Sequence, residues 1–402
     1  MSKFGAILLI CACQLTPKSD SIPCDAAAKQ KKADESRMWV APGRGEKAIV
    51  PFRRANRWGY LDNKGRVAIE PHYQNAGRFR YGRAFADKTI IDQNNELVVG
   101  LPANCDQVIL SERSFWFCTG NKWGLMDYAG SLLISETYDE VRRFSEGLAA
   151  VNRGARWEFP GIQVGGRWGY VDETGSETIT VKYAKAGEFH FGRAVVETHL
   201  SAIPDDFLPR TRSDAIDPND TRIFPISGYA HGHFADGLLA VESEQWTTYF
   251  DLNGKPKFEI FGSGDQFHNG VAARRTADFG AINTTGKVVF QSDWEVGPLC
   301  CNRASITHGD REFGFVDESG VLTIPQVYNE VNDFEDGVAV VHRDGKLNEL
   351  CDAPFYWTGG IWVLIDVAGN ELAAIEMDEP TQPEGKIEVP PRKSPVDPNF
   401  DD

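Results

Sequence analysis

The feature that most constrains this chain is a tryptophan-glycine pair that recurs along it. Each pair is followed by an aspartate and, three residues later, by a second glycine. The complete copies are Trp58, Gly59, Asp62 and Gly65; Trp123, Gly124, Asp127 and Gly130; and Trp168, Gly169, Asp172 and Gly175. Self-similarity of this kind predicts a repeat protein, in which each unit buries its apolar face against its neighbours.

Eroded copies continue the series toward the C-terminus. Two of them have phenylalanine in place of tryptophan, two have lost the adjoining glycine, and one more is degenerate. They are Phe279, Gly280, Asn283 and Gly286; Phe313, Gly314, Asp317 and Gly320; Trp246, Asp251 and Gly254; Trp362, Asp366 and Gly369; and Asp92 to Asn95. The steps of 32 and 34 residues from Asp251 to Asn283 and on to Asp317 give a unit of about 33 residues. Seven copies are recognisable and eight or nine are possible, because the 79 residues between Asp172 and Asp251 hold either a long loop or a lost repeat.

The Asp-x-x-Gly element predicts a β-hairpin. An aspartate that opens a type I turn can cap the turn amides with its carboxylate, and a glycine at the fourth position takes the left-handed conformation that leads into the returning strand. Phe-x-x-Gly turns also recur, at Phe79, Phe144, Phe189, Phe234, Phe267 and Phe334. A tyrosine stands eleven residues after four of the aspartates, at Tyr73, Tyr138, Tyr183 and Tyr328.

These residues resemble the WG repeat family, which is known largely from bacterial proteins and is named for the Trp-Gly pair. The resemblance covers about residues 46–375 and is strongest at Trp58, Trp123 and Trp168. It implies an all-β array of tandem repeats that binds partners, and it supplies no catalytic residues.

Two all-β architectures accommodate such units. One is a β-propeller, in which blades of three or four strands surround an axis, and the alternative is an open β-repeat stack, or solenoid. Seven copies favour the propeller, whereas an eighth or ninth would favour the open array. The chain begins within a unit, at residues 48–52, and ends after the Asp366 hairpin, so its two ends could share one blade. We therefore predict a propeller-like ring.

The first 13 residues have the pattern of a targeting segment. Lys3 precedes a short apolar run that ends Ile10-Cys11-Ala12-Cys13, which resembles the lipobox of bacterial lipoproteins, and by that resemblance Cys13 would carry lipid. Residues 14–37 read as a polar tether, 38–377 as the repeat array, and 378–402, with six prolines, as a disordered acidic tail. We expect an exported, lipid-anchored envelope protein, with a secreted or periplasmic protein as the alternative.

Six further cysteines are compatible with disulfides in an exported chain. They are Cys24, Cys105, Cys118, Cys300, Cys301 and Cys351. Cys105 and Cys118 flank one strand connection and are the predicted bridge, with buried free thiols as the alternative.

Candidate chemistry is sparse. The repeated tryptophans could form a sugar-binding platform, but packing between units explains them better. The repeated aspartates could pair as acid and base, but turn capping explains them better. His231 and His233 could point to one face of a strand and bind a metal with a third ligand. A group of oxygen-bearing side chains could bind calcium, although its spacing matches no known loop. That group is Asp214, Asp217, Asn219 and Asp220.

The sequence contains no nucleophile elbow, phosphate-binding loop or zinc-protease motif, so we predict no catalytic residue, cofactor or metal. The formal net charge of −16 argues against nucleic acid as a partner. We expect a non-catalytic platform that binds a protein or glycan at the cell envelope and meets the membrane only through a possible N-terminal lipid. The alternative is a hydrolase of an envelope polymer with a site assembled across repeats.

Overall fold

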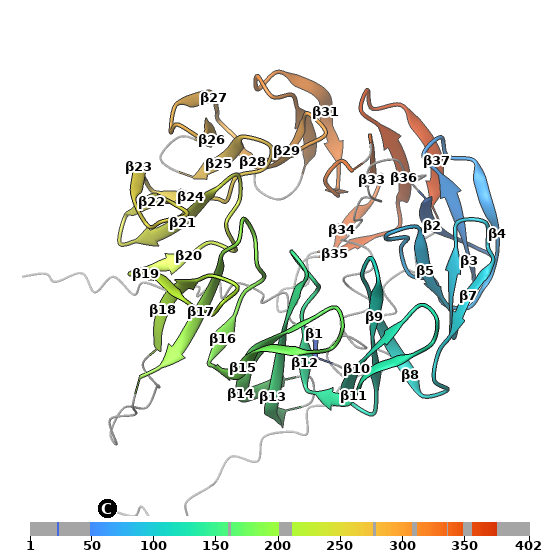
Figure 1. Cartoon of the computed structure of the whole chain (residues 1–402). Helices are drawn as coiled ribbons and strands as arrows, with labels where there is room; N and C mark the ends of the chain where they lie inside the picture. The colour runs from blue at the N-terminus through green and yellow to red at the C-terminus, as the bar shows by residue number, and fades with distance from the viewer. Residues whose placement is uncertain are drawn as a thin grey trace, which may run out of the picture.

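The computed structural model describes residues 22–23, 49–159, 162–200, 211–275, 279–307, 312–335, 337–348 and 356–375. These residues form nine small antiparallel sheets arranged in a ring, and they contain no helix (Figure 1). Each sheet is one blade of a β-propeller. The predicted all-β, propeller-like fold is therefore confirmed.

The blades follow one another in chain order. Blades 1 and 2 are three-stranded: β2 (Ile49–Arg54), β3 (Arg57–Asp62) and β4 (Val67–Tyr73); β5 (Arg83–Ala86), β6 (Thr89–Asp92) and β7 (Leu97–Gly100). Blades 3 to 5 are β8 (Cys105–Leu110), β9 (Ser114–Thr119), β10 (Lys122–Asp127) and β11 (Leu132–Tyr138); β12 (Glu140–Val141), β13 (Leu148–Phe159), β14 (Ile162–Asp172) and β15 (Glu177–Tyr183); β16 (Lys185–Ala186), β17 (Ala194–His199), β18 (Thr211–Ile216) and β19 (Arg222–Ile226).

Blades 6 to 9 repeat the same order. They are β20 (Tyr229–Ala230), β21 (Leu238–Ser243), β22 (Trp246–Asp251) and β23 (Pro256–Phe261); β24 (Ser263–Gly264), β25 (Val271–Arg275), β26 (Phe279–Asn283) and β27 (Val288–Ser292); β28 (Glu295–Cys300), β29 (Arg303–Thr307), β30 (Phe313–Val316) and β31 (Leu322–Tyr328); β32 (Glu330–Val331), β33 (Val338–Arg343), β36 (Ile361–Asp366) and β37 (Glu371–Ile375).

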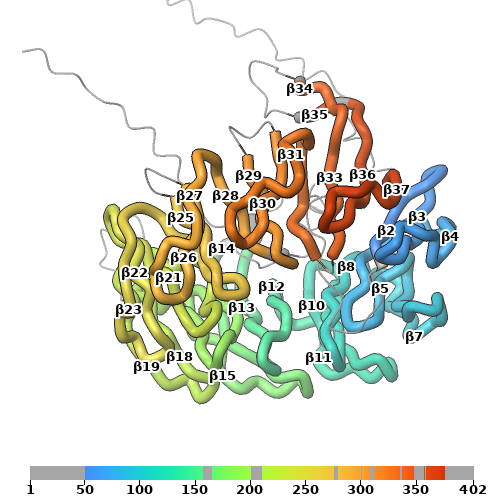
Figure 2. Tube along the Cα trace, turned by 90° about the horizontal axis from the view of Figure 1, so that it is seen from above, coloured from blue at the N-terminus to red at the C-terminus, as the bar shows by residue number. Residues whose placement is uncertain are grey.

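Two short elements lie outside this pattern. The strands β34 (Lys346–Asn348) and β35 (Tyr356–Thr358) extend the β33–β36 hairpin away from the ring (Figure 2). The strand β1 (Ile22–Pro23) pairs with β12 at the inner edge of blade 4.

Because neighbouring strands of a blade are antiparallel, the first and third turns of each four-stranded blade lie on the same face of the ring. The first turn is the Phe-x-x-Gly element in blades 4 to 7 and 9, and the third turn is the Asp-x-x-Gly element or its equivalent. We call this side the Phe-turn face. The inner strands surround the axis, and the hairpins that contain the Asp-x-x-Gly turns form the outside of the ring (Figure 1).

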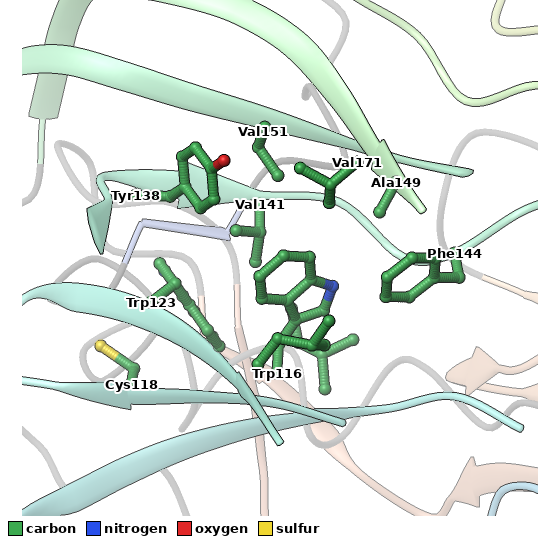
Figure 3. Packing of buried hydrophobic residues seen from close by; sticks show 11 residues of the cluster. Trp116, Cys118, Trp123, Tyr138, Val141, Phe144, Ala149, Val151 and Val171 are labelled. Atoms are coloured by element: carbon green, nitrogen blue, oxygen red, sulfur yellow. The ribbon is translucent and has the colours of Figure 1, made fainter. Parts of the chain in front are cut away.

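The core of the protein lies between blades rather than within them. One cluster joins Trp116 and Trp123 of blade 3 to Val141, Phe144 and other apolar residues of blade 4 (Figure 3). The Trp116 and Phe144 rings stack with centroids 5.6 Å apart. Alternation of side chains along each strand presents one apolar set to each neighbouring blade, so every blade depends on the next for burial.

Hydrogen bonds reinforce the contacts between blades. The Tyr60 hydroxyl of blade 1 donates to the Gly77 carbonyl before blade 2 at 2.8 Å, and the Tyr170 hydroxyl donates to the Gly187 carbonyl at the same distance. Each tyrosine also packs against the phenylalanine of the next Phe-x-x-Gly element, as Tyr170 does against Phe189 at 4.8 Å. The repeated phenylalanine is therefore a wedge between adjacent blades.

The ring closes by packing blade 9 against blade 1. Val50, Phe52 and Leu61 share a cluster with Val338 and Leu364. The α-carbon of Gly65 also approaches blade 9 so closely that an added Cβ would lie 2.6 Å from the carbonyl oxygen of Leu372. Within the described residues, neither end of the chain adds a strand to the other end's blade, so the predicted shared blade is not seen there.

Nine copies are present, including the two that the sequence left uncertain. Asp92 opens the outer turn of blade 2, and Asp217 opens that of blade 5, so the long interval between Asp172 and Asp251 contains a repeat that has lost its Trp-Gly pair. The expectation that an eighth or ninth copy favours an open array is wrong. Apolar contact between blades 1 and 9 closes the ring of nine blades.

Candidate functional site: the inner rim of the Phe-turn face

Each repeated aspartate caps the turn in which it lies. In blade 4, the Asp172 Oδ1 atom accepts hydrogen bonds from the backbone amides of Thr174 at 2.9 Å and Ser176 at 3.0 Å, and Gly175 has φ +89°. Burial raises the pKa of the Asp172 carboxyl, but the hydrogen bonds from Thr174 and Ser176 outweigh it and hold the pKa below its ordinary value. The corresponding oxygen caps the turn in every blade, in blade 7 from an asparagine. The capping residues are Asp62, Asp92, Asp127, Asp172, Asp217, Asp251, Asn283, Asp317 and Asp366.

The fourth position of this turn packs against the preceding blade. A Cβ on Gly175 would lie 2.9 Å from Cγ1 of Ile134 in blade 3, and one on Gly320 would lie 2.5 Å from the Phe290 ring in blade 7. The glycines at 65, 130 and 286 occupy the same position, with φ between +73° and +85°. Glycine is used here because it tolerates both the left-handed conformation and the close approach.

The glycine of each Trp-Gly pair has a different role. A Cβ on Gly169 would lie 2.4 Å from the carbonyl oxygen of Ile179, and one on Gly59 would lie 2.5 Å from that of Ile69. At this point the outer strand bulges, because Trp168 pairs with Tyr183 and Tyr170 pairs with Ile179. The equivalent positions also carry contacts below 3.0 Å, at Gly124, Gly280 and Gly314. Only glycine leaves room for the bulged strand.

The tryptophans form no shared platform. Trp123 is fully buried between blades 3 and 4, and Trp168 is 5% exposed between blades 4 and 5. Trp58 is half-buried, with the Arg53 guanidinium over its ring. In the described part of the chain, the indole nitrogen of Trp123 has no hydrogen-bond partner. A phenylalanine would lose no hydrogen bond at this position, which agrees with Phe279 and Phe313 in blades 7 and 8.

The side chains of the two proposed metal-binding groups make other contacts. Gly232, with φ +65°, breaks the alternation between His231 and His233. His231 bonds Glu242 at 2.8 Å, whereas the His233 ring stacks on His190 with centroids 3.7 Å apart. Asp214 pairs with Arg212 and Arg222, Asp217 caps its turn, and Asp220 binds Lys182 and Tyr183. Among the residues that the structure describes, no group of three or more acidic, histidine or cysteine side chains could hold a metal ion.

The predicted disulfide between Cys105 and Cys118 is wrong. Cys105 is a free buried thiol, whereas Cys118 is disulfide-bonded. A bulge between the two strands pairs Cys105 with Thr119 and Gln107 with Cys118, so the two cysteines are not opposite each other. Cys301 is free and exposed. The predicted lipidation site Cys13, together with Cys24 and Cys351, lies outside the described residues.

The residues that the sequence reasoning missed lie beside the repeated phenylalanines. Each inner strand ends in a two-residue turn on the Phe-turn face, and the side chains just before and just after the phenylalanine come from the strand end nearest the axis. We call these side chains the inner rim. They are Arg78, Arg80, Arg143, Ser145, Glu188, His190, His233, Ala235, Gln266, His268, Asp333 and Glu335. One sequence pattern points to these positions: the phenylalanine and glycine of the Phe-x-x-Gly element repeat, whereas the residues beside the phenylalanine differ from blade to blade.

Blades 5, 6 and 7 contribute imidazoles to the inner rim. Glu188 Oε2 lies 3.6 Å from His190 Nε2, and the His190 ring stacks on that of His233. Burial, together with the neighbouring His190, lowers the pKa of His233 to about 4. Burial also lowers the pKa of His268. The neutral forms of His233 and His268 are therefore favoured at neutral pH.

Blades 2 and 4 contribute arginines, and blade 9 contributes carboxylates. Burial and the nearby Arg143 lower the pKa of Arg80 to about 10, while Glu335 and Glu188 act in the opposite sense. These four side chains come from four different blades. Burial raises the pKa of Asp333, beside Phe334, to about 6.

The turns of the Phe-turn face have unusual residues at a strained position. In blades 2 and 5 the two turn residues are Tyr81 and Gly82, and Phe191 and Gly192, all with φ between +50° and +71°. This is a type I′ turn, which favours asparagine, aspartate or glycine at both positions. Tyr81 and Phe191 are nevertheless aromatic, and they are 40% and 49% exposed. Bulky side chains held at positive φ and left in solvent mark a position selected for something other than stability.

Carboxylates fix these turns relative to one another. Glu146 of blade 4 accepts hydrogen bonds from the backbone amides of Phe191 at 2.7 Å and Gly192 at 2.8 Å in blade 5. Asp236 of blade 6 accepts one from Gly270 of blade 7 at 2.6 Å. The exposed aromatic ring of Phe191 is therefore presented by a turn held at both of its amides.

The fold defines the protein as a nine-bladed β-propeller. A sequence model described as the WG containing repeat matches residues 58–88, 123–157, 168–198 and 313–346, so the chain is a WG-repeat protein. Each matched stretch begins in the strand before the Asp-x-x-Gly turn of one blade and ends in, or just after, a strand of the next blade. The sequence unit is therefore offset from the structural blade, and each unit links two neighbours.

Similar solved structures have low sequence identity. One is a eukaryotic initiation factor, at 12% identity, with a TM-score of 0.45 and coverage of 82% of this chain and 85% of that chain. Another is BamB from Moraxella catarrhalis, at 10% identity, with a TM-score of 0.38 and coverage of 76% of this chain and 96% of that chain. A third is the β-propeller domain of the Trilobed protease from Pyrococcus furiosus, at 13% identity, with a TM-score of 0.36 and coverage of 83% of this chain and 99% of that chain. No curated protein matches the chain. The described residues contain no helix that could cross a membrane.

Proposed function

We propose that this WG-repeat propeller is a non-catalytic binding platform whose ligand, a protein or a glycan, docks on the Phe-turn face. A repeat-based binding or scaffold role is what the WG propeller suggests at the level of the fold. The observation that carries the proposal further is the pair of exposed aromatic residues, Tyr81 and Phe191, at strained turn positions beside the charged inner rim. Rigid aromatic side chains give a large contact area at low entropic cost.

The turn chemistry allows a sharp test of this proposal. Blade 7 has Asn269 at the same turn position, with φ +51°. Replacing Tyr81 and Phe191 with asparagine should relieve strain, because asparagine tolerates the left-handed conformation. We expect the Tyr81→Asn and Phe191→Asn double variant to be as stable as the wild type or more stable, and to lose its ligand.

The experiment is affinity capture from detergent-solubilised native envelopes with the tagged full-length chain, followed by mass spectrometry and a binding titration of what is captured. The matched control is Leu97→Ser with Val327→Ser, two side chains 68% and 60% exposed on the outer strands β7 and β31. A saturable ligand that is retained by the control and lost by the asparagine variant supports the platform. Equal binding by both variants contradicts it.

The location of the platform is part of the same proposal. The N-terminal lipobox resemblance supports an exported protein anchored by a lipid on Cys13, with a secreted or periplasmic protein as the alternative. Metabolic labelling with a radioactive fatty acid tests this, because label should enter the wild type and not the Cys13→Ser variant. Equal labelling of the two, or recovery of the wild type with the cytosol, contradicts the anchor.

A second candidate is a hydrolase acting on an envelope polymer. The observation in its favour is Asp333, whose buried carboxyl has a pKa of about 6, as a general acid requires. The turn aspartates do not contribute, because each caps its own turn. Turnover of an envelope polymer by the wild type, abolished by Asp333→Asn, would place this function ahead of the binding platform.

A further inference from the structure

Two of the turns on the Phe-turn face hold a carboxylate from the preceding blade. The two oxygens of the Glu146 carboxylate, in the turn of blade 4, accept hydrogen bonds from the Phe191 amide at 2.7 Å and the Gly192 amide at 2.8 Å. In the same way, Asp236 in the turn of blade 6 accepts one from the Gly270 amide of blade 7 at 2.6 Å. The receiving turns of blades 5 and 7 have no acidic residue at their two central positions. A non-acidic turn of this face is therefore a carboxylate-binding element.

The turn of blade 2 has the same sequence pattern and geometry as the receiving turn of blade 5. Residues 79–83 read Phe-Arg-Tyr-Gly-Arg, and residues 189–193 read Phe-His-Phe-Gly-Arg. Two backbone hydrogen bonds close each turn, at 2.7 and 2.9 Å in blade 2 and at 2.8 and 3.1 Å in blade 5. The two central residues have φ +50° and +71° in blade 2, and +54° and +67° in blade 5. The two turns therefore present their central amides in the same way.

No carboxylate of the described chain is bound to the blade 2 turn. Among the residues that the structure describes, the amides of Tyr81 and Gly82 donate no hydrogen bond. The preceding blade explains this difference from blade 5. In its described part, blade 1 consists of β2, β3 and β4, and it has no Phe-x-x-Gly turn from which an acidic side chain could reach blade 2. Two adjacent amides are thus available to an acceptor from outside the ring.

Local charge distinguishes this turn from those of blades 4 and 6. Each of those turns has an acidic side chain of its own, which would repel a second anion. The blade 2 turn instead lies between Arg80 and Arg83. Arg83 Nη1 donates to the Tyr81 carbonyl oxygen at 3.0 Å, and the guanidinium carbon lies 4.0 Å from the centroid of the Tyr128 ring. A positive charge is therefore fixed at the turn, where it favours an anion on the two amides.

We propose that the Tyr81–Gly82 turn binds a glutamate side chain of a protein ligand, in the way that the Phe191–Gly192 turn binds Glu146. Each of the two amides donates to one oxygen of the ligand's carboxylate. The Tyr81 ring, 40% exposed at the same turn, contacts the apolar part of the ligand. The carboxylate held by the equivalent turn is that of a glutamate, so a protein ligand is favoured over a glycan. This inference rests on the proposed function and names the group that is recognised.

NMR titration of the full-length chain at fixed ionic strength tests the proposal at the amide itself. Tyr81-Gly82 is the only Tyr-Gly pair in the sequence, so isotope labels on tyrosine carbonyl carbons and glycine nitrogens isolate the Gly82 amide signal. The probe is N-acetylglutamate α-amide, the matching glutamine compound is the uncharged control, and glucuronate represents a glycan carboxylate. We expect the glutamate probe to shift the Gly82 signal saturably, with a Kd on the order of 1 mM, and the glutamine compound to leave it unchanged.

A pair of variants at Tyr81 tests the charge requirement. Aspartate and asparagine both occur at the equivalent turn position, as Asp236 with φ +49° and Asn269 with φ +51°, so both substitutions are compatible with the backbone. Tyr81→Asp should bind the glutamate probe at least about 5-fold more weakly than Tyr81→Asn, because the two variants differ only in a charge beside the amides. Leu97→Asp is the control. It adds the same charge at a 68% exposed position on β7 of the same blade, and it should bind the probe as the wild type does.

The blade 5 turn provides a positive control. Glu146→Asn removes its carboxylate, and the Phe-Gly amide signal that this substitution shifts belongs to Gly192. In this variant, the glutamate probe should shift the Gly192 signal as it shifts that of Gly82. Thermal melting establishes that each variant is folded. If Gly192 responds in the variant and Gly82 responds in no protein, the turn type binds carboxylates but blade 2 is not a site, and the proposal is wrong.

The proposal is also overturned if the Gly82 signal responds to glucuronate alone, or if Tyr81→Asp and Tyr81→Asn bind the glutamate probe equally. Its failure is distinguishable from failure of the platform. If the double asparagine variant at Tyr81 and Phe191 loses the captured ligand while Gly82 ignores the probe, the platform stands and the glutamate site is wrong. If Gly82 responds but the captured ligand is indifferent to both substitutions, the glutamate site stands and the platform is wrong.

Discussion

The outer hairpins and the inner strand ends of this propeller are built from the same repeat but use it in opposite ways. The outer hairpin repeats one chemistry around the ring: a capped turn, a left-handed residue at its end and, in blades 1, 3, 4 and 8, a glycine beneath a bulge. The inner rim repeats only the phenylalanine wedge and the turn glycine. Beside them it has arginine in blade 2, glutamate and histidine in blade 5, and aspartate and glutamate in blade 9.

This difference separates residues that maintain the fold from residues available for binding. A side chain that performs the same contact in successive blades, such as the Asp172 cap, is explained by the blade itself. A side chain that changes at an equivalent position, while the backbone around it stays the same, is not required by the blade. We infer that the outer hairpins determine stability and that the inner rim determines what is bound.

The largest expected effect is at the glycine of the Trp-Gly pair. Gly169→Val places a branched side chain where a Cβ would already be 2.4 Å from a backbone oxygen. Since backbone and not a flexible side chain must move, we expect a loss of about 4 kcal/mol or more in the free energy of unfolding. Chemical denaturation measures this. Gly100→Ala, where nothing lies within 4 Å, should change stability by less than about 1 kcal/mol. Similar losses at both positions would contradict the bulge explanation.

The next effect separates buried from exposed copies of one repeat residue. Trp123→Ala should lose about 3–5 kcal/mol, because it empties a large site in the core between blades 3 and 4. Trp246, which is 45% exposed at the equivalent position in blade 6, should lose less than about 1 kcal/mol when replaced by alanine. Thermal and urea unfolding of the two variants compare them directly. Equal losses would show that interblade packing does not govern the tryptophan positions.

Titration of the inner rim should alter stability in acid. His233 has a pKa of about 4 when folded, below the ordinary histidine value, so the unfolded chain binds the proton more tightly. Stability should fall as the pH decreases from about 6.5 to about 4, by at most about 3 kcal/mol from this group. His233→Gln should flatten this part of the pH profile. An unchanged slope would mean that His233 is not held neutral by burial.

Asp333 should act with the opposite sign. Its pKa of about 6 is above the ordinary aspartate value, so the folded chain binds this proton more tightly than the unfolded chain does. The stabilisation of the fold by this proton is therefore present in acid and is lost as the pH rises through 6. Asp333→Asn should therefore make the protein more stable at pH 7, by about 1–2 kcal/mol, and no more stable at pH 4. Stability curves measured at both pH values provide the test. If the variant were less stable than the wild type at pH 7, the explanation that Asp333 is a buried carboxyl without a compensating charge would be wrong.

The smallest expected effect is at a single turn cap. Asp172→Ala removes two hydrogen bonds to backbone amides and should lose about 1 kcal/mol at neutral pH. Because the folded carboxyl has a lowered pKa, its stabilisation is present above the ordinary aspartate pKa and is lost as the pH falls through the folded value. The variant and the wild type should therefore converge in acid. A constant difference down to that range would show that the charged cap contributes nothing.

Much of the outer hairpin was predictable from the sequence, because its geometry is determined locally. Asp62-x-x-Gly65 contains both the capping oxygen and the residue with positive φ, so the turn could be derived from four residues. Closure could not be derived in this way. It depends on the packing of residues such as Phe52 and Leu364 into one cluster, although they are far apart in the sequence, and no local pattern predicts how far each blade is rotated from the one before.

The candidate site was missed for a related reason. Arg80, Arg143 and Glu335 belong to three different blades, and only the ring places them on one face. His231 and His233 were predicted to share a face, but the positive φ of Gly232 between them cancels the alternation. The cysteine prediction failed because the β8–β9 register places Cys105 opposite Thr119 and Cys118 opposite Gln107, and the sequence does not reveal that register.

Hydrogen-deuterium exchange of the full-length chain, with and without its captured ligand, tests the separation of inner rim from outer hairpins most directly. We predict new protection at the turns around residues 78–82, 143–147 and 188–192. The outer turns that follow Asp62, Asp127 and Asp172 should exchange as they do in the free protein. Protection confined to the outer hairpins or to the opposite face of the ring would contradict the assignment of binding to the inner rim.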